Sequence, residues 1–348
     1  MKNILIAGAI FAGLGIALGY GVLHAKQIRT LVRGEPTNEE MPQEIETPRD
    51  SAVPTPNDDG AEIPDASRSC TFTTQQDVQY GVGKTLLGDK KLFLDAYIPT
   101  ECNGKKITGS VAPVMVIHGG GFTTGDKSGG KDDGSGNAAV FAQKLAERGF
   151  AAFSLNYRML NDKPVLETNQ EKIIKDIGTT KEKLVAGTAA YEQLKTYLAA
   201  VATEDALKAQ KYLNTNSAKY TIDTNRWGLT GMSAGAVTVM GMAYAADDWF
   251  GTNVNVKAVI NLWGTFDARF VEAGESPHLI VVGSADNVVP YAELVQFHEE
   301  VQSTVESRFV TAEGMRHGLK PESVYTFVNP ETDQVIFEDI IDYLEEKL

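Results

Sequence analysis

A serine between two glycines is the first feature of this sequence that could do chemistry, in the run Gly-Met-Ser-Ala-Gly at 231–235. The β-type run 226–230 leads into it, and a helix-type run rich in Ala, Val and Met follows. A serine on such a tight strand-to-helix turn is exposed as a nucleophile, and side chains in place of the glycines would collide with neighbouring elements. We therefore expect Ser233 to attack a substrate. The N–H of Ala234 would face the substrate oxygen, aided by the helix dipole.

A glycine run, His118-Gly119-Gly120-Gly121-Phe122, follows the apolar run 114–117 and precedes the serine by over 100 residues. Three glycines let backbone N–H groups approach an oxyanion closely. A phosphate loop would carry a Gly-Lys-Ser/Thr sequence here, and none follows. The run therefore predicts an oxyanion loop. His118 could be read as a base, but we expect it to brace the loop.

A nucleophilic serine needs a base, and the base needs an orienting carboxylate. Three histidines follow the serine in the sequence, and two of them, His278 and His298, fall inside a predicted strand and helix. His317 lies in a loop just after the last predicted strand, and Asp286 lies just past the strand before it. Both stand at the strand ends where ligands bind in parallel sheets. The chain order Ser233, Asp286, His317 is that of a hydrolase triad.

The elements that must position these residues begin near residue 69. Phe72–Tyr80 and Lys91–Ile98 are expected to form an antiparallel hairpin with its turn over 81–90. Further strands are expected at 114–118, 151–157, 226–230, 256–262, 278–283 and 307–312, and helices near 137–148, 204–214, 234–246, 290–303 and 333–347. Strands alternating with helices imply parallel pairing through right-handed crossovers. The sequence thus predicts an α/β fold with an eight-stranded, mostly parallel sheet and helices on both faces.

With these motifs in place, residues 69–348 resemble an α/β-hydrolase of the carboxylesterase type with a His-Gly-Gly-Gly oxyanion loop. The resemblance extends to bacterial esterases and to relatives of acetyl- and feruloyl-xylan esterases. It is also carried by Leu94–Pro99 before the oxyanion loop, by the Asn-Tyr-Arg-Met run at 156–159 and by Glu204–Ala209 before the serine strand. It implies that the N–H groups of Gly120 and Gly121 hold the oxyanion together with that of Ala234. The chain departs from a compact member by an insertion at about 159–203.

The insertion reads as two amphipathic helices, 169–184 and 189–202, that would form a cap beside the site and shape substrate choice. The alternative is a lateral insertion without a role in catalysis. Trp263 and Phe266 follow the sixth strand, where they would line the substrate pocket or belong to the core.

The two cysteines, Cys70 and Cys102, are too few for a disulfide scaffold or a structural zinc site. If Tyr80 pairs with Lys91, residue numbers across the hairpin sum to about 171, so extending the ladder brings Cys70 opposite Cys102. We expect a disulfide there, with two free thiols as the alternative. A disulfide implies an oxidising compartment, and so a cell-envelope, extracytoplasmic location.

The N-terminal segment 1–25 holds a 20-residue apolar run, Ile4–Leu23, which favours an uncleaved membrane anchor over a cleaved secretion signal. The domain would then be membrane-anchored or secreted. Residues 26–68 read as a disordered linker, because 34–68 hold six of 13 prolines and 35–66 supply −9 of the net charge of −14. Such an acidic chain is not expected to bind nucleic acid.

These features predict a serine hydrolase that cleaves small-molecule or carbohydrate esters without a metal or cofactor. Two alternatives remain: a peptidase of the prolyl-oligopeptidase type, and a non-catalytic binding or adhesion module on the same fold. The peptidase is disfavoured because no propeller precedes the domain of this chain and because the glycine loop favours esters. Non-catalytic members of the fold typically lose the serine or the histidine, and both are present here.

Overall fold

The computed structural model describes residues 68–129, 137–176, 191–318 and 323–348. The predicted anchor at 1–25, nearly all of the predicted linker at 26–68 and residues 177–190 of the expected cap lie outside these residues. No helix within the described ranges is both long enough and apolar enough to cross a bilayer.

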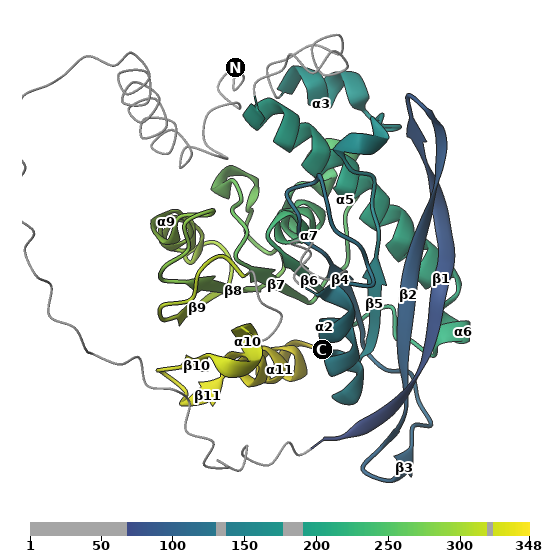
Figure 1. The fold of residues 1–348 in the computed structure, drawn as a ribbon, viewed down its shortest axis with the longest axis vertical. Helices are drawn as coiled ribbons and strands as arrows, with labels where there is room; N and C mark the ends of the chain where they lie inside the picture. The colour runs from purple at the N-terminus through teal and green to yellow at the C-terminus, as the bar shows by residue number, and fades with distance from the viewer. Residues whose placement is uncertain (1–67, 130–136, 177–190, 319–322) are drawn as a thin grey trace, which may run out of the picture. The chain divides into compact units, whose positions relative to one another are not determined.

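One large sheet organises the described chain, as predicted (Figure 1). Its strands lie in the order β1 (Cys70–Thr85), β2 (Gly88–Cys102), β5 (Ala151–Leu155), β4 (Pro113–Ile117), β6 (Gly228–Met232), β7 (Ala258–Leu262), β8 (His278–Gly283) and β9 (Ser307–Ala312), and the short β3 (Lys105–Lys106) pairs with β2. β2 runs antiparallel to both of its long neighbours, and the pairs from β5 to β9 are parallel. The carboxyl ends of β6, β8 and β9 therefore share one edge.

Helices cover both faces of the sheet because side chains along a strand alternate between them. In β4, Met115 and Ile117 pack with α5 (Tyr191–Thr215), α7 (Ala234–Tyr244) and α9 (Tyr291–Val301). Val114 and Val116 pack on the other face with α2 (Ala138–Glu147), α10 (Ser323–Thr326) and α11 (Ile336–Lys347). Figure 1 shows these two helical layers on either side of the sheet.

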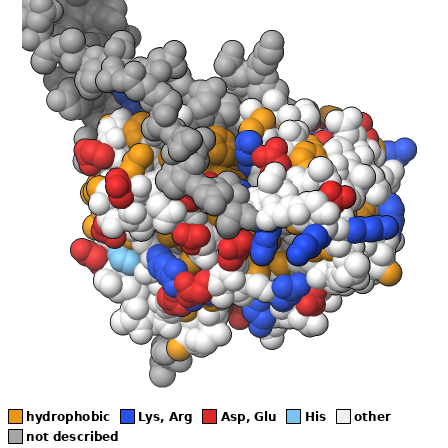
Figure 2. All heavy atoms as spheres, turned by 90° about the horizontal axis from the view of Figure 1, so that it is seen from below, with side chains coloured by type: hydrophobic (Ala, Val, Ile, Leu, Met, Phe, Trp, Pro, Cys, Tyr) orange, Lys and Arg blue, Asp and Glu red, His pale blue; other side chains and the backbone are white. Residues whose placement is uncertain are grey.

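Shorter elements complete the described chain. They are α3 (Gln170–Asp176), α6 (Ser217–Tyr220), α8 (Ala246–Phe250), the 3-10 turns η2 (Leu160–Asp162) and η3 (Ala268–Phe270), and a small two-stranded sheet of β10 (Val328–Asn329) and β11 (Gln334–Val335). From the α11 side, Lys, Arg, Asp and Glu side chains of the described residues are interspersed (Figure 2). This face therefore presents no field of a single sign.

The β1–β2 hairpin is longer than predicted: its strands run on to Thr85 and from Gly88, so the turn is Leu86–Leu87 and not the whole of 81–90. Gly83 lies within the predicted turn, but in the structure it is part of β1 and makes room for Arg158. A Cβ on Gly83 would stand 2.4 Å from the Arg158 Nε atom.

The base of the hairpin confirms the predicted disulfide, because Cys70 pairs with Cys102 in the ladder and their Sγ atoms are bonded. The bond closes a loop between residues 32 apart in sequence. In the chain-entropy view, such a closure stabilises the fold by about 3–4 kcal/mol.

The helix expected at 189–202 and the one expected at 204–214 are a single helix, α5. Residues 197–203 of this helix are buried against the sheet face and α7, so this part of α5 belongs to the core. The run Ala199-Ala200-Val201-Ala202 explains the difference, since such small side chains let helices approach closely. α3 begins within the first expected helix and is described as far as Asp176. The cap at about 159–203 stays a prediction.

Arg158 ties the hairpin, the loop after β5 and α5 together. Its buried guanidinium donates to Asp205 at 2.9 Å and Glu204 at 2.7 Å. It also donates to the carbonyls of Lys84 and Val165. These bonds use most of its donors, which is the condition for burying an ion pair without a large penalty.

Candidate active site

Ser233 occupies the turn between β6 and α7, with φ 52° and ψ −115°. Cβ atoms on Gly231 and Gly235 would each stand 2.1 Å from a carbonyl oxygen, that of Gly235 and that of Ile117 respectively. Both positions therefore require glycine. The N–H of Ser233 donates to the Leu262 carbonyl at 2.9 Å, which fixes the turn to the end of β7. The hydroxyl is thus held at the carboxyl edge of the sheet.

Three side chains form a hydrogen-bonded line at this edge. His317 Nδ1 lies 2.8 Å from Asp286 Oδ2, and His317 Nε2 lies 2.9 Å from Ser233 Oγ. A carboxylate can only accept, so Nδ1 carries the proton and donates to it. Nε2 is then an acceptor, and the Ser233 hydroxyl donates to it. This arrangement allows the imidazole to remove the serine proton.

The loops that carry Asp286 and His317 are joined to each other by backbone bonds. The N–H of Ser284 donates to Ala312 and that of Ala285 to Met315, both at 3.1 Å. The Asp286 carboxylate is fixed further, because its Oδ1 accepts the N–H groups of Val288 and Val289 at 2.9 Å each. Its Oδ2 is left for the imidazole. The distance between acid and base is therefore set by the backbone.

The glycine loop after β4 turns sharply, with φ of 101° at Gly120 and 61° at both Gly121 and Phe122, and its start lies against Gly235, two residues after Ser233. The N–H groups of Thr123 and Thr124 donate to the Gly120 carbonyl and close the turn. Among the described residues, the N–H groups of Gly120, Gly121 and Ala234 donate to no backbone carbonyl. They are therefore available to a ligand.

His118 braces this loop from below. Its ring is fully buried and stacks on Tyr157, with centroids 4.5 Å apart. Its Nδ1 donates to the Gly119 carbonyl at 2.8 Å, and the Tyr157 hydroxyl donates to the His118 carbonyl at 3.1 Å. These contacts match the structural role expected of His118. Tyr157 belongs to the 156–159 run singled out from the sequence, but its role as a brace could not be read there.

A charged network that sequence reasoning missed holds the far end of the glycine loop. Lys127 is nearly buried, and its Nζ donates to Asp95 at 2.8 Å and Asp77 at 2.9 Å. Burial opposes its charge, but these two carboxylates outweigh burial and raise the pKa of Lys127. Asn156 joins the network by accepting the Lys127 N–H at 2.6 Å and donating to Asp126 at 2.8 Å. The only sequence signal was a set of polar residues beside apolar strands.

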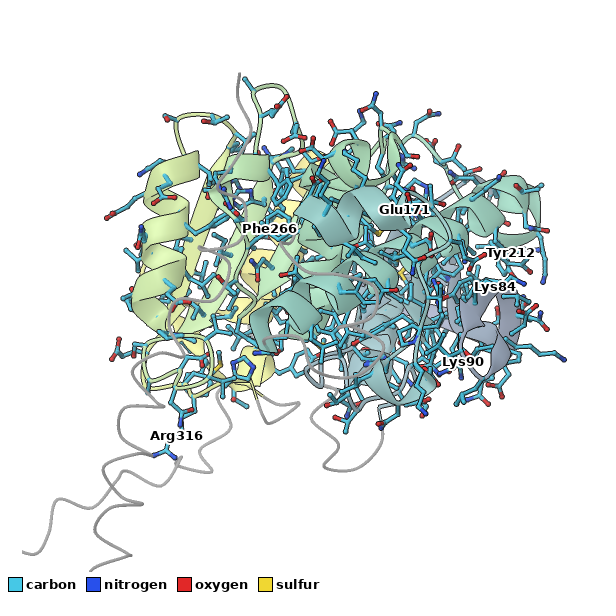
Figure 3. The ribbon with its side chains drawn as sticks, turned by 90° about the horizontal axis from the view of Figure 1, so that it is seen from above. Lys84, Lys90, Glu171, Tyr212, Phe266 and Arg316 are labelled. Carbon is cyan, nitrogen blue, oxygen red and sulfur yellow. A yellow bond between two sulfur atoms is a disulfide. The ribbon has the colours of Figure 1, made fainter. Side chains whose placement is uncertain are left out.

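Trp263 and Phe266 follow β7 as expected, but both are nearly buried. A Cβ on Gly318 would stand 2.0 Å from the Trp263 ring, so the indole contacts the residue after His317. Phe266 packs between Tyr244 and Phe270, with centroids 6.3 and 5.8 Å away. Figure 3 shows Phe266 within the body of the domain and Arg316, the neighbour of His317, at its rim. A substrate-binding role for the two aromatic residues stays a prediction.

Asn261 is a buried polar residue in the apolar strand β7, and it fixes the turn after that strand. Its amide donates to the Gly264 carbonyl at 2.7 Å and accepts the Gly264 N–H at 2.8 Å. Gly264 in turn packs against the Ser233 turn.

The described residues contain no cluster of three or more His, Cys, Asp or Glu side chains that could hold a metal ion.

Comparison with known proteins supports the fold. The sequence matches no protein-family model, and no curated protein matches it. A truncated carbohydrate esterase from gut microbiota is 18% identical and superposes with a TM-score of 0.52 over 80% of this chain and 97% of its own. The propionate-bound esterase Est2 of the Planctomycetes species Thermogutta terrifontis is 17% identical, with a TM-score of 0.50 over 80% and 93%.

A bifunctional GH43-CE protein of Bacteroides eggerthii is 18% identical, with a TM-score of 0.53 over 79% of this chain but 38% of its own. At such identities the likeness shows a shared fold. Together with the sheet order and the Ser233 turn, it shows that the chain has the α/β-hydrolase fold.

Proposed function

We propose that this protein is a serine hydrolase that cleaves carboxylic esters. The observation that carries the proposal is the hydrogen-bonded line from Asp286 through His317 to Ser233, beside the free N–H groups of the glycine loop. This geometry supplies a nucleophile, its base, an orienting acid and a place for negative charge.

The mechanism follows from the donors and acceptors. His317 Nε2 takes the proton of the Ser233 hydroxyl as the oxygen attacks the ester carbonyl. Negative charge moves to the carbonyl oxygen, where the N–H groups of Gly120, Gly121 and Ala234 stabilise it. The imidazolium then gives its proton to the departing alcohol, which leaves an acyl group on Ser233. Water, deprotonated by His317, attacks this acyl group and releases the acid.

Asp286 stays ionised throughout. It accepts the His317 Nδ1 proton, holds the imidazole in the tautomer that leaves Nε2 free, and stabilises the imidazolium. The substrate class we propose is a small-molecule or carbohydrate ester, because the similar solved structures include esterases and a carbohydrate esterase. The non-catalytic alternative has no support here, since all three side chains are present and in contact.

The test is labelling by an active-site fluorophosphonate together with hydrolysis of p-nitrophenyl esters of increasing acyl length. The intact protein should be labelled and active, and Ser233→Ala should lose both properties while remaining folded. Ser303→Ala, an exposed serine on the surface, is the control and should behave like the parent. More than a few per cent of activity left in Ser233→Ala would refute the assignment.

We also propose that the domain works outside the cytoplasm, as a cell-envelope protein. The Cys70–Cys102 disulfide supports this, because such bonds persist in oxidising compartments. Membrane association through residues 1–25 remains part of the same proposal.

A further inference from the structure

A groove of about 720 Å³ lies along the outer side of α5, away from the Ser233 turn. The second half of α5 lines one side, Phe250 at the end of α8 and the following residues 252–255 line another, and Trp227 also lines the groove. Its volume falls in the range of about 300–1,000 Å³ that is usual for ligand sites.

The groove is separate from the proposed active site. Trp227 immediately precedes β6, and Ser233 immediately follows it. The five residues of β6 span about 17 Å at 3.3 Å per residue, so the two lie at opposite edges of the sheet. Figure 3 agrees: Tyr212, on the same half of α5, lies far from Arg316, the neighbour of His317.

Uncharged hydrogen-bonding side chains dominate the lining. Four carry amides and four carry hydroxyls: Gln210, Asn214, Asn253, Asn255, Thr168, Thr215, Thr224 and Thr252. Two of the three lining ionic groups already have partners, because Glu204 binds Arg158 and Lys208 binds Glu167; the third, Lys211, is exposed. The half-buried ring of Phe250 adds an apolar surface.

Two of the amides are placed to bind a ligand. The Gln210 side chain is 8% exposed, lines the groove and makes no hydrogen bond to any described residue. Its amide atoms are not among the fully buried described side-chain atoms that lack a partner, so they reach solvent and can bond to water or to a ligand. Asn214 accepts the Trp227 indole N–H at 2.8 Å, which fixes its orientation and leaves its two N–H donors for a ligand.

We propose that this groove binds a neutral oligosaccharide. The amide groups offer donors and acceptors, which suit neighbouring sugar hydroxyls, and the half-buried Phe250 ring offers an apolar surface to one face of a pyranose. The proposal goes beyond ester hydrolysis: the protein would hold a polysaccharide chain at a place distinct from the scissile bond. It does not depend on Ser233 being a nucleophile.

The test is binding of neutral hexasaccharides of xylose, mannose or glucose to the full-length Ser233→Ala protein, by calorimetry and ligand-observed NMR. Hexagalacturonate is the charged comparison. At least one neutral hexasaccharide should bind, and more tightly than hexagalacturonate. The Asn253→Ala/Asn255→Ala double variant and Gln210→Met should each weaken binding by about fivefold or more. Gln302→Ala, an exposed side chain after α9, should leave it unchanged.

Two outcomes would overturn the proposal. One is a folded protein that binds no neutral hexasaccharide, or prefers the charged one. The other is binding that both groove variants leave unchanged. When the same groove substitutions are made in protein that retains Ser233, the variants should hydrolyse p-nitrophenyl acetate like the parent. A failure of this inference is therefore distinguishable from a failure of the esterase proposal, which only the hydrolysis assay reports.

Discussion

The indole ring of Trp263 lies against the backbone of Gly318, the residue that follows His317. A Cβ at Gly318 would stand 2.0 Å from the ring, so the two chain segments are in direct contact. Trp263 is itself held in the left-handed region, with φ 49°, and its N–H donates to Val281. The position of the histidine is thus coupled to the turn after β7.

Gly318→Ala should lower kcat by about 10- to 100-fold with a smaller change in KM, because the methyl group must displace the indole or the histidine loop. Steady-state kinetics on p-nitrophenyl esters measures this. Trp263→Phe should restore part of the loss by making room. Gly109→Ala, where a Cβ meets nothing within 4 Å, is the control. Unchanged kinetics in Gly318→Ala would show that the contact does not position His317.

Asp286→Asn should cut kcat by about 10⁴-fold while leaving the fold intact, because an amide no longer selects the imidazole tautomer with a free Nε2. The comparison is Asp267→Asn, a nearly buried acid after β7 that pairs with Arg269. It should retain most activity. If the two variants exchanged these behaviours, Asp267 would be the orienting acid.

Arg158→Met should destabilise the protein by about 3–5 kcal/mol, because Glu204 and Asp205 would remain buried without their cation. The free energy of unfolding in urea is the measurement. Arg308→Met is the matched control: its side chain is 40% exposed and pairs with Glu346, so it should cost no more than about 1 kcal/mol. Equal losses in the two variants would contradict the importance assigned to burial.

Acid should destabilise the fold through His278. Burial, with a smaller contribution from His298, lowers the pKa of His278 from 6.5 to about 4. Between these pH values the unfolded chain binds a proton that the folded chain excludes, so stability falls as pH decreases from about 6.5 to about 4. The full effect is about 3 kcal/mol.

The hydrogen bonds around His278 show which of its ring nitrogens carries the proton. The Tyr244 hydroxyl donates to the Ser276 carbonyl at 2.7 Å, so it accepts from His278 Nδ1 at 2.8 Å. A His278→Gln variant lacks the titrating group, and its stability should depend less on pH across this window. The measurement is the free energy of unfolding of parent and variant at several pH values. An equal dependence on pH in the two proteins would contradict the prediction.

Cys70 and Cys102 should be fully oxidised in protein taken from intact cells, because we place the domain in an oxidising compartment. Alkylation after rapid acid quenching, followed by mass spectrometry, counts free thiols directly. Two alkylated cysteines would refute the extracytoplasmic location. The esterase proposal would survive, since the disulfide closes the base of the hairpin and contacts none of the three proposed catalytic side chains.

The fold was largely predictable from local patterns. β8 and β9 have the bounds that the sequence predicts: β8 is an apolar run, β9 alternates polar residues with Phe309 and Val310, and a turn follows each strand. The position of the hairpin turn and the full length of α5 could not be predicted from such local patterns. Gly83 serves a distant arginine rather than a local turn, and the small residues near Ala200 belong to the core rather than to a separate helix.

The candidate site divides in the same way. Ser233, Asp286 and His317 could be named because each follows a strand and their order is informative. The supports, such as Lys127 and Asn261, could not be. Their partners lie far away in sequence or in backbone atoms, and residue types carry no record of such contacts.

The backbone at Ser233 has a further consequence. A residue with a side chain in the left-handed region costs about 1–3 kcal/mol, and the fold must supply that energy elsewhere. Selection for durability and selection for turnover therefore act in opposite directions at this one position. A descendant freed from catalysis could relax the turn and gain stability. One that keeps the reaction must also keep the compensating interactions, such as the ion pairs around Arg158, so distant parts of the chain evolve under the same constraint.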